Sequence, residues 1–120
     1  MNITSILSFC TDFRFVLLVL LGSVLGLFIG AIPGLSVTMA TALLVSVTYS
    51  WTTSDAMATI MGLYVVGVFS GALSAILINI PGAPSSVVTA FDGYPMSRRG
   101  EAKKALKYAT IFAFVGSVFG

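Results

Sequence analysis

Hydrophobic residues are gathered in long blocks along this chain. Four apolar runs, near residues 15–32, 35–50, 56–80 and 105–120, are separated by short polar segments. The first run holds 18 residues, which as a helix would be about 27 Å long, close to the hydrocarbon thickness of a bilayer. The pattern therefore predicts several helices that cross or enter a membrane.

The composition supports this membrane setting. Hydrophobic residues make up 58% of the chain and charged residues 8%, and the mean hydropathy is +1.07. Soluble domains carry about 25% charged residues. We therefore predict an all-α integral membrane protein, with residues 1–120 forming part of one polytopic helical membrane domain. We also suspect that the chain is the first part of a longer protein, because residue 120 falls inside an apolar run.

The few polar side chains that could carry chemistry exclude several function classes. The chain has one cysteine, Cys10, and no histidine, which argues against a disulfide framework or a zinc site, so we expect no cofactor. Between Phe15 and Ser97 the only acidic or basic residues are Asp55 and Asp92. The net charge of +2 comes from one basic loop and gives no reason to expect a nucleic-acid partner.

Proline and glycine interrupt the apolar sequence at two places. Pro33-Gly34 follows the first run, and Pro81-Gly82-Ala83-Pro84 follows the third. Proline lacks a backbone N–H and disfavours helix in the residue before it, so nearby carbonyl and amide groups lose their helical partners. Such backbone is tolerated at membrane depth only where protein buries it or where it lines a watery cavity. Each break is therefore either a transporter's binding site or simply the exit turn of a helix.

The sequence around the first break is partly repeated at the second. Ile32-Pro33-Gly34 followed by Thr41-Ala42 reappears 48 residues later as Ile80-Pro81-Gly82 followed by Thr89-Ala90. Each copy places a helix break before a segment with hydroxyl groups. Two such breaks facing each other would build a site from paired half-helix ends. The hydroxyl groups that we expect to contribute are Ser36, Thr38, Ser85, Ser86 and Thr89.

Glycine recurs at every fourth position of the first run. These residues are Gly22, Gly26, Gly30 and Gly34. They form one helix face without side chains, which another helix can approach closely. Packing alone explains the first two, whereas Gly30 and Gly34 flank the first break.

Asn79 stands directly before the second break. It continues a row of small residues at four-residue spacing, Gly67, Gly71 and Ala75, and is therefore expected to point into the packed interior. Its amide would either form an interhelical hydrogen bond or contact a substrate or ion near the break.

The sequence also predicts the local structure of three polar segments. Ser54 is predicted to be an N-cap, with Asp55 in the first turn where the helix dipole favours an anion. Asp92-Gly93-Tyr94-Pro95 is predicted to form a tight turn. The segment Ser97–Lys107 holds five basic residues and is predicted to be a cytoplasmic loop.

Two stretches resemble one known family. They are GxxxGxxPG at Gly26–Gly34 and SAILINIPGAPSSVVTAFDGYPMSRRGEAKKAL at Ser74–Leu106. Both are similar to the N-terminal part of the large membrane subunit of the tripartite tricarboxylate transporters, the TctA-type family. The resemblance covers nearly the whole chain but only the first part of a many-span family member.

The resemblance implies secondary, ion-gradient-driven uptake of tricarboxylates or related carboxylates across the bacterial inner membrane. It also implies a coupling cation, Na⁺ or H⁺, and two partners, a small membrane subunit and a periplasmic solute-binding protein. The motif residues that carry over are Gly30, Pro33, Gly34, Asn79, Pro81, Gly82, Pro84, Ser85 and Ser86.

Two other function classes remain open from the residues alone. A purely structural assembly subunit would use the glycine faces for packing, but packing does not need an amide beside a break. An intramembrane enzyme would use Asp92 or Asp55 as its acid or base. We predict that the chain is not an enzyme, because no pair of nucleophile and base is visible.

Overall fold

The computed structural model describes residues 2–120, and all the regular structure in that range is helical. The helices are α1 (Ile3–Thr11), α2 (Phe13–Ala31), α3 (Val37–Val47), α4 (Thr53–Ile78), α5 (Val87–Arg98) and α6 (Ala102–Phe119). Short 3-10 turns are η1 (Thr48–Ser50) and η2 (Pro84–Ser86). The all-α membrane fold predicted from the sequence is confirmed.

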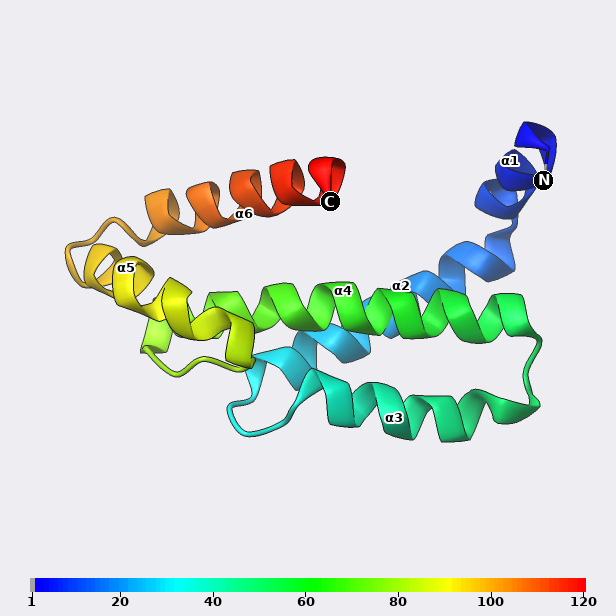
Figure 1. Ribbon diagram of the computed structural model, residues 1–120, viewed down its shortest axis with the longest axis horizontal. Coiled ribbons are helices and arrows are strands. Elements are labelled where there is room, and N and C mark those ends of the chain that lie inside the picture. Colours follow the sequence, from blue (N-terminus) through cyan, green and yellow to red (C-terminus); the bar gives the residue numbers. More distant parts are fainter. Residues whose placement is uncertain (1) are drawn as a thin grey trace.

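Two of these helices are long and apolar enough to cross a membrane. They are α2 with 19 residues and α4 with 26 residues. The apolar segment Val37–Ser50 is shorter, because α3 begins only after the first break and η1 ends it. The breaks therefore leave α4 as the longest helix, and the shorter elements are arranged around it (Figure 1).

Helices α2 and α4 run parallel and touch through their backbones. A methyl group at any of three α2 glycines would collide with a carbonyl oxygen of α4. The colliding pairs are Gly22 with Thr59, Gly26 with Leu63, and Gly30 with Gly67. The predicted glycine face is thus confirmed as a helix-packing surface, and only glycine permits an approach this close.

Gly34 has a different role from the other glycines of its row. It is exposed, lies beyond the end of α2, and has a φ of 91°. That left-handed conformation turns the chain so that α3 runs back along α2 and α4 (Figure 1). Val37 at the start of α3 then packs against Gly67.

After α4 ends, the chain folds back along it. The backbone N–H of Gly82 donates to the carbonyl of Gly71, at 3.5 Å, well before the end of α4. Helix α5 then returns toward that end, and Gly93 packs against Ile76. The segment from Asn79 to Arg98 is therefore a re-entrant excursion beside α4.

The predicted tight turn at Asp92–Pro95 is wrong, because these residues lie inside α5. Pro95 sits in the last turns of the helix, so its missing N–H removes only the bond to the carbonyl of Phe91. Gly93 is needed for packing, since a methyl group there would lie 2.6 Å from Cγ1 of Ile76. The predicted loop Ser97–Lys107 is also shorter than expected, because α5 continues to Arg98 and α6 begins at Ala102.

The start of α4 also differs from the prediction. The N-cap residue is Thr52, without a side-chain bond to the helix, and Ser54 lies inside the first turn. Asp55 is in the first turn as predicted, and its carboxylate pairs with Arg14 at 2.8 Å. This ion pair joins the beginnings of α2 and α4.

Candidate functional site

The second break lies against the end of α2, directly before the first break. A methyl group at Gly82, in the second break, would collide with the carbonyl oxygen of Gly30 at the end of α2. It would also lie 3.1 Å from the Cα of Gly71 and 3.2 Å from the hydroxyl oxygen of Ser74. The second copy of the repeated motif therefore contacts the helix end before the first copy through backbone atoms, whereas Pro33 and Gly34 themselves are exposed.

A face of small residues on α4 holds both breaks. Gly67 packs against Gly30, which precedes the first break, and against Val37, which follows it. One turn later, Gly71 receives Ala83 and the hydroxyl oxygen of Ser86 from the second break, at 3.1 and 3.2 Å from a methyl group placed there. Both breaks are therefore positioned by the same stretch of one helix.

Two buried serines on this face of α4 donate hydrogen bonds to backbone carbonyls. The hydroxyl of Ser70, which is 1% exposed, donates to the carbonyl of Leu27 in α2 at 2.7 Å. The hydroxyl of Ser74 donates to the carbonyl of Gly71 at 2.9 Å. The first bond crosses between helices and ties α4 to the last turn of α2, directly before the first break.

The helix ends at this contact have opposite polarity. The carboxyl end of α2 carries carbonyl groups, whereas η2 and the beginning of α5 form a helix start at which the N–H groups of Ser86 and Val87 donate to the carbonyls of Ala83 and Pro84. Partial negative charge at the first favours a cation, and partial positive charge at the second favours an anion.

The predicted site residues are placed at different depths. Those that meet at the contact are buried: Gly30, Gly82 and Ser86. Those at its margin are half-buried: Ser36, Pro81 and Thr89. Those on the surface of the chain described here are Pro33, Gly34, Thr38, Asn79, Pro84 and Ser85.

Asn79 does not point into the packed interior as predicted. It is exposed and has a left-handed backbone with a φ of 59°, while its N–H donates to the carbonyl of Ala75. Asparagine tolerates this conformation, which commonly ends a helix. The turn moves Asn79 off the face that Gly67, Gly71 and Ala75 share.

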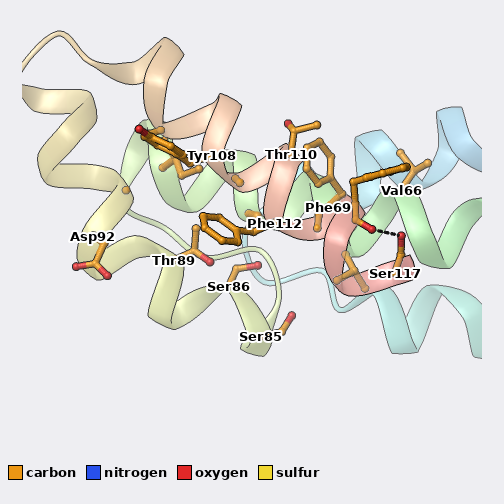
Figure 2. Close-up of a pocket in the computed structure, with 18 of the residues that line it drawn as sticks. Val66, Phe69, Ser85, Ser86, Thr89, Asp92, Tyr108, Thr110, Phe112 and Ser117 are labelled. Carbon is orange, nitrogen blue, oxygen red and sulfur yellow. Dashed lines mark hydrogen bonds between the residues drawn. The ribbon is translucent and has the colours of Figure 1, made fainter. Parts of the chain in front are cut away.

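A groove of about 910 Å³ runs between α4, α5 and α6 beside the second break. Apolar side chains of α4 and α6 form most of its wall, including Phe69 and Phe112. Figure 2 shows its polar edge, where Ser85, Ser86, Thr89 and Asp92 follow one another along η2 and α5. The second break therefore opens onto a mostly apolar groove with one polar side.

Asp92 is the lining residue that sequence reasoning did not assign to the transport site. It was considered only as the acid or base of an enzyme. The signal that could have identified it is its spacing, because Ser86, Thr89 and Asp92 recur at every third position after the break. Such residues are neighbours on one helix face.

A family model matches most of this chain. The model of the tripartite tricarboxylate transporter TctA family matches residues 16–120. The chain belongs to this family. The resemblance seen in the two sequence motifs is thus confirmed, and the TctA family is one of transporters.

One curated relative extends the comparison. This TctA-family chain is 39% identical over 93 residues to an uncharacterized 52.8 kDa protein in the TAR-I ttuC′ 3′ region of Agrobacterium vitis. The match covers 78% of the present chain and 18% of that protein, so the chain spans less than a fifth of the relative's length. No solved structure gives a significant match.

Proposed function

We propose that this chain forms the N-terminal part of the large membrane subunit of a secondary, ion-gradient-driven tripartite transporter. In this proposal the subunit is a multi-pass protein of the bacterial inner membrane and takes up tricarboxylates or related carboxylates. Membership of the TctA family supports the class of protein. The contact between Gly30 and Gly82 supports the position of the site.

That contact carries the proposal because it brings two helix ends of opposite polarity together at membrane depth. Along α4 the contact lies between Gly67 and Gly71, 12 to 16 residues after Asp55, which corresponds to about 18–24 Å along the helix axis. The hydrocarbon core is about 30 Å thick, so this level is well inside it if Asp55 marks the boundary. Backbone of this kind persists at that depth where protein buries it or where it lines a watery cavity, and interrupted helices mark the binding sites of many secondary transporters.

In this proposal each group of residues has its own task. The proline and glycine residues interrupt the helices: Gly30, Pro33, Gly34, Pro81, Gly82 and Pro84. The hydroxyl and amide groups of the remaining residues contact the carboxylate or the cation: Ser36, Thr38, Asn79, Ser85, Ser86 and Thr89. Exposed members of this set would complete the site together with the other parts of the transporter.

The family also suggests how the substrate arrives. A periplasmic solute-binding protein would deliver the carboxylate, and a small membrane subunit would assemble with this chain. An inward gradient of Na⁺ or H⁺ would drive uptake, because a secondary transporter has no other energy source.

Uptake of a radiolabelled tricarboxylate such as citrate, and of shorter carboxylates, tests the proposal. Cells that express the complete transporter should accumulate at least one of them, and accumulation should depend on Na⁺ or on external pH. Cells that lack only the solute-binding protein serve as the control and should accumulate much less. Accumulation of none of the carboxylates would contradict the proposed function.

A further inference from the structure

A second groove lies at the end of the molecule that holds the Arg14–Asp55 ion pair. It has a volume of about 600 Å³ and is lined by α1, α2 and the first half of α4, and we call it the N-terminal groove. Its lining on α4 extends from Ser54 to Val66, which corresponds to about 18 Å along the helix axis. Half of the hydrocarbon core is about 15 Å thick, so the groove has the depth of one leaflet of the membrane.

The N-terminal groove is apolar along this length. Ala58 and Gly62 are buried in it, and the side chains of Met57 and Met61 are exposed. Ser23 also lines it, but its hydroxyl donates to the carbonyl of Val19 at 2.7 Å within α2. Among the described residues that line the groove, none is charged. The groove therefore suits a hydrocarbon ligand.

The width of the N-terminal groove matches a hydrocarbon chain better than a helix. A volume of about 600 Å³ over a length of about 18 Å corresponds to a mean width of about 6 Å. An α-helix with its side chains is about 10–12 Å across. Carbon atoms of neighbouring hydrocarbon chains pack about 4 Å apart. One acyl chain therefore fits into the groove, whereas a whole helix does not.

Charged side chains stand at the boundary end of the N-terminal groove. Arg14 and Asp55, which pair at 2.8 Å, are the sequence neighbours of the lining residues Phe15 and Ser54. The side chain of Arg14 is nevertheless 78% exposed. A guanidinium group has five N–H donors, so Arg14 can bind a phosphate while it keeps its ion pair.

The balance of charge at this end favours one kind of head group. Asp12 is exposed and is the N-cap residue of α2, without a side-chain bond to the helix. Asp12, Arg14 and Asp55 together carry a formal charge of −1, which disfavours a head group with negative charge alone. A zwitterionic head group complements both signs, because its phosphate can contact Arg14 and its ammonium group can contact Asp12.

We propose that the N-terminal groove binds one acyl chain of a zwitterionic phospholipid with an amine in its head group. The phosphate contacts Arg14 and the ammonium group contacts Asp12. The lipid belongs to the leaflet at the Arg14–Asp55 end, and its chain fills the space between α1, α2 and α4. This inference depends on the chain lying in a membrane and not on the substrate that the transporter carries.

Native mass spectrometry of the complete large subunit, purified in detergent, tests the proposal. Phosphatidylethanolamine and phosphatidylglycerol with the same acyl chains are added separately. The wild type should bind one phosphatidylethanolamine at least about fivefold more tightly than phosphatidylglycerol. Met61→Trp places a large ring in the groove and should weaken the binding of both lipids at least about tenfold. Val88→Trp is the matched control, because Val88 is exposed on α5 and lies outside the groove, and it should bind as the wild type does.

Asp12→Asn separates the head group from the groove, because it changes an exposed position and leaves the apolar lining intact. The preference for phosphatidylethanolamine should fall by about two- to fivefold. Thermal unfolding is the second readout, since phosphatidylethanolamine should raise the Tm of the wild type and leave that of Met61→Trp unchanged. Equal affinity of the wild type for the two lipids, or unchanged binding of phosphatidylethanolamine in Met61→Trp, overturns the proposal.

Discussion

Single glycine residues serve two separate purposes in this chain. At Gly22, Gly26 and Gly30 the missing side chain lets two backbones touch. At Gly34 and Gly100 the backbone has φ values of 91° and 80°, and nothing lies within 4 Å of where a side chain would begin. The first group is needed for space and the second for conformation.

Gly26→Ala should destabilise the protein by about 1–3 kcal/mol, because its methyl group would meet the carbonyl of Leu63. Gly116→Ala is the matched control, since this residue is also inside a helix but has open space around it. It should be neutral or stabilise α6 by up to about 1 kcal/mol. Thermal unfolding in detergent measures both variants. Equal effects would contradict the tight contact between α2 and α4.

Asn79 needs a test that separates its backbone from its amide. Asn79→Gly keeps the left-handed helix end and removes the amide, whereas Asn79→Leu removes both. If the amide contacts the substrate or the ion, both variants should lose about 1–3 kcal/mol of binding, or roughly five- to hundredfold in affinity. This is the result that we expect in uptake measured against substrate and cation concentration. Normal affinities in Asn79→Gly would assign Asn79 to ending α4 and no more.

At the scale of elements, the two proline breaks decide how the helices are arranged. The first allows α3 to return beside α4, and the second brings Gly82 back to Gly71. Pro95 shows that proline alone does not break a helix, because α5 continues through it. A break here needs proline followed by glycine and a surface of α4 that accepts the exposed backbone.

Pro33→Ala should restore a backbone donor after α2 and favour a longer helix. We expect transport to fall while the amount of assembled protein stays near normal, because the end of α2 would no longer be free to contact the second break. Pro95→Ala is the matched control, as it restores a donor inside a helix that already continues. Unchanged uptake in Pro33→Ala would reduce this proline to a packing kink.

The sequence predicts those features that depend on neighbouring residues. Apolar runs, the two breaks and the glycine face of α2 were all visible as local patterns. The turn at Asp92–Pro95 was wrong because proline is tolerated late in a helix, and packing of Gly93 on Ile76 selects the helix. The inward direction of Asn79 was wrong because a left-handed residue leaves the periodicity of its helix.

Other features follow only from how distant segments pack. Arg14 and Asp55 pair because α2 and α4 are parallel, which no spacing in the sequence reveals. The groove beside α5 exists because α6 lies across from it, and no spacing in the sequence shows that α6 takes this position. The two breaks could be predicted from the sequence, but the groove beside the second break could not.

At the scale of the whole molecule, charge is separated between the two ends of α4. The Arg14–Asp55 pair lies at its beginning, whereas the basic residues lie where α5 meets α6. These residues are Arg98, Arg99, Lys103, Lys104 and Lys107, and all are exposed. A hydrogen bond to Tyr94 raises the pKa of Arg98 above its ordinary value.

We predict that the basic end is cytoplasmic and that the Arg14–Asp55 end faces the periplasm. The test uses single cysteines introduced at Ser97 and at Ser54, in a background where the exposed Cys10 is replaced by serine. A membrane-impermeant thiol reagent added to intact cells should label the cysteine at position 54 and leave position 97 unlabelled. Efficient labelling at position 97 would reverse the orientation.

The backbone contact between α2 and α4 limits how this part of the transporter can move. No side chain stands between the two helices at Gly22, Gly26 or Gly30, and the Arg14–Asp55 pair closes one end of the seam. Sliding or rolling one helix over the other would force carbonyl oxygens of one helix into Cα atoms of the other. The two helices therefore behave as one rigid body. Movement of the other elements relative to this pair is therefore concentrated at the breaks Pro33-Gly34 and Pro81–Pro84. The packed pair of α2 and α4 stays fixed during that movement.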